Sequence, residues 1–95
     1  MIIEQARIEI KEGQGDIYAE MYPEFKHLFM TVPGGVITRL LRDQANPDSF
    51  VCCMEWESQE ARDLFIADTR RKPWSARFRP LVAHETIHFF DEIAR

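Results

Sequence analysis

Two histidines near the C-terminus are the side chains of this sequence best suited to move a proton. His84 and His88 are four residues apart in a segment where a strand would place both on one face. Imidazole titrates close to neutral pH, so His88 is a candidate general base. The alternative is that His84 lies in water at the strand end and that a neighbour pairs with His88. About 13 Å of strand separates the two positions, so we predict no metal site between them.

Two arginines in other predicted strands could hold an anion. Arg39 and Arg7 both lie in segments of alternating polar and apolar residues. A guanidinium group that faced a cavity would stabilise a negatively charged ligand, and Arg39 is our candidate for that role. The alternative is a charge pair with Glu4, Glu9 or Glu55 across the sheet, because sheets favour opposite charges on facing positions.

The two cysteines, Cys52 and Cys53, are adjacent, so a strand would direct them to opposite faces. A disulfide between them would need distorted geometry, and the sequence has no cysteine and histidine spacing typical of a metal site. A reducing, cytoplasmic location fits this pattern. The sequence has no apolar run of the roughly 20 residues that a membrane span needs, so we expect no membrane association.

The charge distribution argues against nucleic acid as a partner. The net charge is −4 and the pI is about 5.3, whereas nucleic-acid binding needs a broad positive surface. Five basic residues and no acidic ones lie in the range 70–79, so this stretch carries +5 and the rest of the chain −9. The stretch is either a solvated helix junction or a guide for an acidic substrate.

The first third of the chain predicts a strand followed by a helix. Residues 2–11 alternate, with Ile2, Ala6, Ile8 and Ile10 on one face. A helix over residues 16–30 should follow, with Asp16 as its N-cap and an apolar stripe of Ile17, Met21, Phe25 and Leu28, widened by Tyr18, Tyr22 and Phe29. Pro23 lies inside it and predicts a kink or a restart.

The remaining two thirds predict three strands and a broken helix. Residues 36–42 and 50–56 read as an antiparallel pair of strands joined by a turn. Ser58 should cap a helix whose apolar positions are Ala61, Leu64, Phe65 and Ala67. Pro73 should open a second helical segment, with Trp74 and Phe78 on one face, and residues 84–91 form the last strand.

This order of elements, β-α-β-β-α-β, predicts one ferredoxin-like α+β domain over residues 1–95, with an antiparallel sheet and both helices on one face. The other face should carry Ile3, Ile37 or Val36, Leu41 or Leu40, and Phe89 or Phe90. Such a face is too apolar to leave in water in a domain of 95 residues. We therefore predict a homodimer that forms through this face.

Four motifs, in this order and spacing, resemble the antibiotic biosynthesis monooxygenase domains of the dimeric α/β-barrel superfamily. They are Pro33-Gly34, the strand end Glu55-Trp56-Glu57-Ser58, the helix from Gln59, and Trp74-Ser75-Ala76-Arg77. The resemblance implies a homodimer whose sheets close into a barrel, with a cavity between the sheet and helices of each subunit. It also implies oxidation of quinols or aromatic polyketides by molecular oxygen with no metal or flavin cofactor.

Trp56 stands at the position of the tryptophan that lines the cavity in this family. It could equally serve as an anchor where the strand meets the helix, because an indole buries a large apolar area. The resemblance implies a cofactor-independent monooxygenase for a small quinol-like or phenolic molecule, in which His88 or Arg39 handles the proton or the anion. The residues expected to line its cavity are Trp56, Trp74, Tyr22, Phe25, Met54 and Cys52.

A second hypothesis is a non-enzymatic dimeric domain that binds a small ligand or serves as a scaffold. Two residues motivate this hypothesis. Cys52 stands where some oxygen-activating relatives have an asparagine, and Ala6 stands where the haem-degrading relatives have one. A packed interior without a cavity of roughly 300 Å³ would favour this hypothesis.

Overall fold

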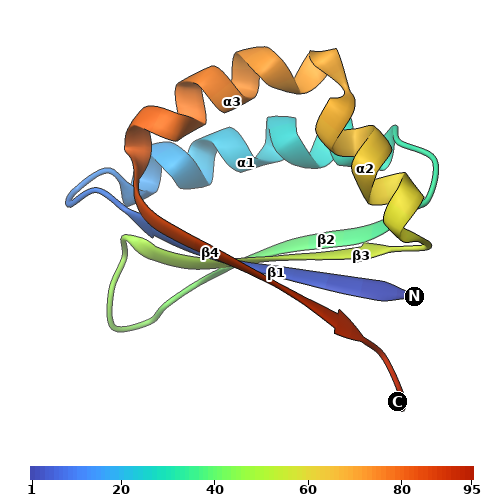
Figure 1. Cartoon of the computed structure of the whole chain (residues 1–95). Helices are drawn as coiled ribbons and strands as arrows, with labels where there is room; N and C mark the ends of the chain where they lie inside the picture. Colours follow the sequence, from blue (N-terminus) through green and yellow to red (C-terminus); the bar gives the residue numbers. More distant parts are fainter.

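A four-stranded antiparallel sheet forms one layer of the protein, and the helices form the other, on one side of the sheet only (Figure 1). The computed structural model describes residues 1–95. The strand order is β2-β3-β1-β4. The predicted ferredoxin-like α+β fold is therefore confirmed. Its elements are β1 (Ile2–Ile10), α1 (Gly15–Met30), β2 (Gly35–Arg42), β3 (Ser49–Trp56), α2 (Gln59–Ala67), the 3-10 turn η1 (Thr69–Arg71), α3 (Lys72–Phe78), the 3-10 turn η2 (Arg79–Leu81) and β4 (Val82–Asp91).

The alternation in β1 determines which side of the sheet is buried. Ala6, Ile8 and Ile10 face the helices and are buried, as predicted, and Glu4 shares their face. The intervening residues Gln5 and Arg7 are exposed on the opposite face. A strand has a side-chain period of two, so this phase extends to the paired strands β3 and β4.

Helix α1 buries the predicted apolar side except for Ile17. Its buried aromatic residues are Tyr18, Phe25 and Phe29, whereas Ile17 is 50% exposed. The chain has apolar residues at both 17 and 18, so the helical period alone does not fix the phase of the stripe. The larger aromatic surface of Tyr18 is buried in preference to Ile17 because burial free energy scales with apolar area.

The N-cap of α1 also differs from the prediction. Asp16 does not cap the helix; its carboxylate pairs with Arg42 at 3.1 Å instead. The backbone amides of Gly13 and Gly15 donate to the carboxylate of Asp48, at 3.0 and 2.9 Å. A carboxylate from the β2–β3 loop thus satisfies the free amide of Gly15 in the first turn of α1 and that of Gly13 just before the helix.

The predicted restart of α1 at Pro23 does not occur. The helix runs from Gly15 to Met30 without a break, and Pro23 is exposed. The ring of Pro23 therefore lies on the solvent side, where water can solvate the backbone carbonyl that loses its helical donor.

The two later helices begin as predicted. Ser58 accepts a hydrogen bond from the amide of Ala61 at 3.2 Å and caps α2, and Pro73 lies in the first turn of α3. Trp74 and Phe78 share the buried face of α3. In α2, however, Leu64 is 62% exposed and does not belong to the apolar side, which Ala61 and Phe65 form.

A chain of aromatic rings fills the space between sheet and helices. The ring centroids of Phe29 and Trp56 are 4.8 Å apart, and those of Trp56 and Phe65 are 5.5 Å apart. Phe25 lies 5.6 Å from Phe65 and 5.1 Å from Trp74. Edge-to-face and tilted pairs of this kind add to the apolar area that each ring buries. The core is therefore built mainly from aromatic side chains.

Gly34 brings the start of β2 close to α2. Its φ is +87°, and a Cβ at this position would lie 2.5 Å from the Cβ of Ala61. Its carbonyl accepts the amide of Glu57 at 2.8 Å, just beyond the end of β3. Glycine is thus required here both for the backbone conformation and for the close approach.

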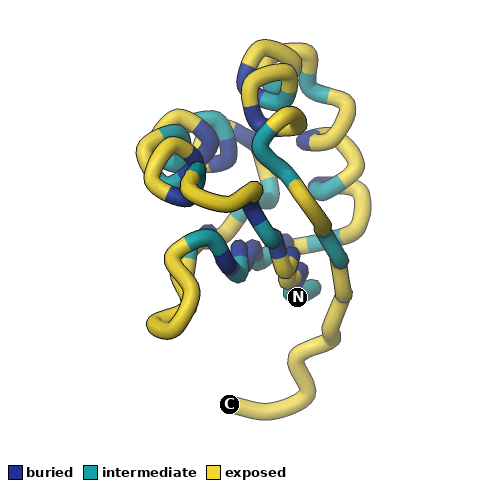
Figure 2. Tube along the Cα trace, turned by 90° about the vertical axis from the view of Figure 1, so that its left-hand side faces the viewer, coloured by how far each residue is buried: buried dark blue, intermediate teal, exposed yellow.

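The face of the sheet turned away from the helices is uncovered and carries both apolar and polar side chains. The register places Ile3, Ile37, Leu41 and Phe90 on it, and the last three are exposed. Leu40 and Phe89 lie on the helix side, because Leu40 pairs with Cys52 and Phe89 with Glu4. Figure 2 shows the end of β4 and the residues after it as exposed chain. We call this surface the outer face.

Candidate functional site

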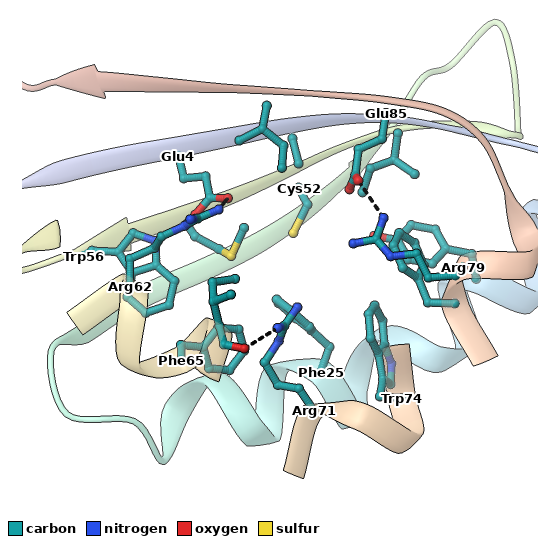
Figure 3. A pocket seen from close by; sticks show the side chains of 17 residues that line it. Glu4, Phe25, Cys52, Trp56, Arg62, Phe65, Arg71, Trp74, Arg79 and Glu85 are labelled. Atoms are coloured by element: carbon teal, nitrogen blue, oxygen red, sulfur yellow. Dashed lines mark hydrogen bonds and ion pairs between the residues drawn. The ribbon is translucent and has the colours of Figure 1, made fainter. Parts of the chain in front are cut away.

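A cavity of about 260 Å³ lies between the inner face of the sheet and the helices (Figure 3). Twelve of its 17 lining residues are hydrophobic. The structure places five of the six predicted lining residues on its wall: Trp56, Trp74, Phe25, Met54 and Cys52. Tyr22 is not among the lining residues; its hydroxyl forms a hydrogen bond with Thr38 at 2.7 Å.

The placement predicted for Arg39 and His88 is wrong. Arg39 pairs with Cys53 and His88 pairs with Gln5, and all four of these residues belong to the outer face. Neither side chain lines the aromatic cavity. The reason is the period of the strand: β4 carries polar and apolar residues on both faces, so its alternation does not show which face meets the helices. Glu85 and Ile87, not the histidines, face the cavity from β4.

A buried carboxylate forms one end of the cavity. Glu4 is 3% exposed and accepts hydrogen bonds from Trp56 Nε1 at 3.1 Å and from Arg62 Nε at 3.2 Å. Arg62 Nη2 lies 3.3 Å from its second oxygen. The two donors satisfy the charge of Glu4 and hold the indole of Trp56 in one orientation. The sequence signal for the burial of Glu4 is its position on the same face of β1 as Ala6, Ile8 and Ile10.

A second ion pair lies at the other end. Arg79 Nη1 is 2.9 Å from Glu85 Oε1. The side chain of Glu85 is 19% exposed and that of Arg79 is 59% exposed, so this pair is partly open to water. Figure 3 shows the two pairs at opposite ends of the cavity, Glu4 with Arg62 at one and Glu85 with Arg79 at the other.

A third arginine, Arg71, enters the cavity from the turn η1 without a carboxylate partner. Its guanidinium lies 5.0 Å from the ring centroid of Phe65, and Nη1 donates to the carbonyl of Ile66 at 3.1 Å. Its Nε is buried and has no hydrogen-bond partner in the protein. Burial, followed by the nearby guanidinium groups of Arg79 and Arg62, lowers the pKa of Arg71.

The thiol of Cys52 and the hydroxyls of Tyr18 and Tyr22 remain protonated at neutral pH. Burial raises the pKa of the Cys52 thiol to about 12 and that of Tyr22 to about 12. Burial also raises the pKa of Tyr18 above its ordinary value. Cys52 is therefore not a thiolate nucleophile, and the two tyrosines can donate hydrogen bonds but cannot act as bases. The carboxylates are the bases available to the cavity.

No group of three or more His, Cys, Asp or Glu side chains comes together as a metal ion would require. None of the helices is long and apolar enough to cross a membrane.

The protein is thus a ferredoxin-like α+β domain with an aromatic cavity between its sheet and its helices. Residues 1–65 match the sequence model of the family described as antibiotic biosynthesis monooxygenase, and the chain belongs to this family. A comparison with curated protein sequences finds no match.

Solved structures share the fold across nearly the whole chain. SnoaB, a cofactor-independent oxygenase from Streptomyces nogalater, is 19% identical with a TM-score of 0.90, covering 99% of this chain and 94% of SnoaB. A protein from Pseudomonas aeruginosa is 14% identical with a TM-score of 0.87, covering 98% of this chain and 94% of that one. A conserved protein from Methanosarcina mazei is 13% identical with a TM-score of 0.86, covering 96% and 91%. At these identities the likeness shows the fold alone.

Proposed function

We propose that this protein is a cofactor-independent monooxygenase that oxidises a small quinol-like or phenolic molecule with molecular oxygen. The observation that carries the proposal is the aromatic cavity, into which the carboxylate of Glu85 projects from β4. Membership of the antibiotic biosynthesis monooxygenase family supports it.

The volume of the cavity limits the substrate to one or two rings. A cavity of about 150 Å³ accepts benzene, and ligand sites usually begin at roughly 300 Å³. The cavity of about 260 Å³ lies between these values. It is somewhat smaller than the size we expected of an enzyme site, which keeps the ligand-binding domain as the second candidate function.

The chemistry needs a base, a dry site and an oriented ring. A phenol that has lost its proton is electron-rich enough to reduce oxygen itself. The phenol loses the hydrogen of one ring C–H bond and the hydrogen of its hydroxyl. One atom of O2 takes up both hydrogens and leaves as water, and the other atom enters the ring to give a quinone. The substrate therefore supplies all the electrons. The protein's part is to remove the proton, exclude water and stabilise the anion.

Glu85 is the group that we assign to proton removal. Glu4 already accepts three hydrogen bonds from Trp56 and Arg62, two of them at Oε1, so it is less available as a base than Glu85. Glu85 accepts only from Arg79 among the side chains, at the more open end of the cavity. Trp56, which Glu4 holds in place, would present its indole to the ring of the substrate.

Oxygen uptake with hydroquinones and dihydroxynaphthalenes tests this function. We expect uptake above the uncatalysed rate, and Glu85→Gln should lower kcat/KM by roughly 100-fold because the base is lost. His88→Ala is the matched control, since His88 lies on the same strand but on the outer face. The proposal fails if the wild type is no faster than buffer, or if both variants lose activity equally.

We also propose that two copies pair through the outer face. Ile37, Leu41 and Phe90 are exposed there, and apolar side chains on one sheet face are costly to leave in water. A dimer of this kind leaves the cavity of each subunit on the helix side, so association and chemistry use opposite faces of one sheet.

The second candidate function, a domain that binds a small aromatic molecule without oxidising it, is favoured by the modest cavity volume. Cys52, on the cavity wall, is a protonated thiol that offers only a weak hydrogen bond. Ligand binding without oxygen uptake would support this alternative.

A further inference from the structure

The charges that line the cavity do not balance. The lining includes three arginines and two glutamates. Glu4 pairs with Arg62 at 3.2 Å and Glu85 pairs with Arg79 at 2.9 Å, which leaves Arg71 alone. The cavity therefore carries one uncompensated positive charge, among walls that are mostly apolar.

The contacts of Arg71 leave one edge of its guanidinium unused. Phe65 covers one face of the group, and Nη1 is occupied by the carbonyl of Ile66. Arginine has five N–H donors; the Nε of Arg71 is buried without a partner, and its one side-chain hydrogen bond within the protein comes from Nη1, which leaves Nη2 unused. A buried donor without a partner is costly, so a ligand that accepted a hydrogen bond from this edge would remove that cost.

The shape of the unused edge indicates the chemical class of the ligand. Nε–H and one Nη2–H point in parallel and match the two oxygens of a carboxylate. A phenolate offers only one oxygen to this fork. A phosphate would bring close to two negative charges against one uncompensated positive charge. A single carboxylate matches both the geometry and the charge.

The position of Arg71 fits a ligand that spans the cavity. Figure 3 shows Arg71 rising from the helical side, near Phe25 and Phe65, while Glu85 projects from the sheet on the opposite side. A ring between these walls could place a carboxylate on Arg71 and a hydroxyl towards Glu85.

We propose that Arg71 binds the carboxylate of the ligand and makes the cavity selective for small aromatic carboxylates. The further statement that this ligand also carries a ring hydroxyl rests on the proposed oxidation. Arg62 and Arg79 do not compete for the ligand, because each is already neutralised by a glutamate.

Calorimetric titration of the full chain with 2-naphthoate and with its neutral analogue 2-naphthamide tests this selectivity. We expect the wild type to bind the carboxylate at least roughly tenfold more tightly than the amide, because a bidentate charge-assisted pair is made only with the carboxylate. Quenching of tryptophan fluorescence should accompany binding, since both tryptophans of the chain line the cavity.

Arg71→Met should abolish this preference and leave the weaker amide binding unchanged. Arg70→Met is the matched control: it removes the same charge from the next residue, whose side chain is exposed and paired with Asp68. It should change both affinities by less than about twofold. Arg71→Lys retains the charge without the fork and should bind naphthoate with intermediate affinity, which keeps the test valid if the methionine variant does not fold.

Equal binding of naphthoate and naphthamide by the wild type would overturn the proposal. So would equal losses in the Arg71 and Arg70 variants, or no binding of either compound. These titrations involve no oxygen chemistry, so naphthoate selectivity without oxygen uptake would reject the proposed oxidation and retain the carboxylate site.

Discussion

The two faces of the sheet are formed by the same four strands but carry different kinds of residues. The inner face and its helices enclose aromatic rings, two buried or half-buried glutamates and three arginines. The outer face carries exposed Ile37, Leu41 and Phe90, together with Arg39 and His88. The inner face lines a cavity with organised charge, whereas the outer face is an uncovered mixed surface, through which we propose that two copies associate. The residues that looked most reactive in the sequence lie on the face without the aromatic cavity.

Removal of the indole at the centre of the inner face should have the largest effect on stability. Trp56 is 0% exposed and contacts Phe29 and Phe65, so Trp56→Ala should lower the free energy of unfolding by about 3–5 kcal/mol. The variant also leaves Glu4 without one of its donors. Urea unfolding followed by circular dichroism measures the change.

Leu64→Ala is the control for this experiment, because Leu64 is largely exposed on α2. It should change the free energy of unfolding by less than about 0.5 kcal/mol. Similar losses in the two variants would contradict the assignment of Trp56 to the core.

A charge placed on the outer face should break the proposed dimer without loss of the fold. Leu41→Lys should raise the dimer dissociation constant by roughly 100-fold, because it buries an unpaired ammonium group in the interface. Leu64→Lys makes the same change at an exposed leucine on the helical layer and should leave the dimer intact. Sedimentation equilibrium of a chain of 11.2 kDa distinguishes the two species. A wild type that is monomeric at all concentrations would refute association through this face.

The smallest effect concerns the tyrosines, both of which lie on the helix-covered side. The folded protein should show almost no tyrosinate at pH 10, the ordinary pKa, because burial raises the pKa of Tyr22 to about 12 and raises that of Tyr18 as well. The unfolded chain should be about half ionised there. Ultraviolet absorbance follows the titration.

The same shifts predict the direction of the pH dependence of stability. A tyrosine whose pKa is higher in the folded than in the unfolded state stabilises the fold. This contribution is complete below pH 10 and is lost as the pH rises towards 12. Ionisation of either tyrosine in the folded protein near pH 10 would show that the inner face is more open than the structure indicates.

The sequence predicted the order and bounds of the strands and helices because residue alternation and capping residues determine them locally. Alternation gave the strands to within two residues at either end, and Ser58 and Pro73 marked the starts of their helices. The phase within an element was harder to predict. Ile17 and Tyr18 are adjacent and both apolar, and only packing against the sheet selects Tyr18 for burial.

The candidate site was only partly predictable for the same reason. The aromatic wall followed from the family resemblance, but the polar lining depends on long-range pairing. Glu4 meets Arg62 across 58 positions of sequence, and no local pattern encodes that contact. The basic stretch at residues 70–79 divides between two environments: Arg71 and Arg79 line the cavity, whereas Arg70 and Arg77 pair with exposed acids. Arg70 and Arg77 thus fit the solvated helix junction, whereas guidance of an acidic substrate stays a prediction.

A two-dimensional ¹H–¹⁵N spectrum, titrated with 1,4-dihydroxynaphthalene in the absence of oxygen, tests most directly whether ligands bind the inner face. The account predicts that the indole signals of Trp56 and Trp74 shift as ligand is added, while the backbone amides of Arg39 and His88 remain in place. Shifts at Arg39 and His88 with unchanged indole signals would contradict it and would place the binding site on the outer face.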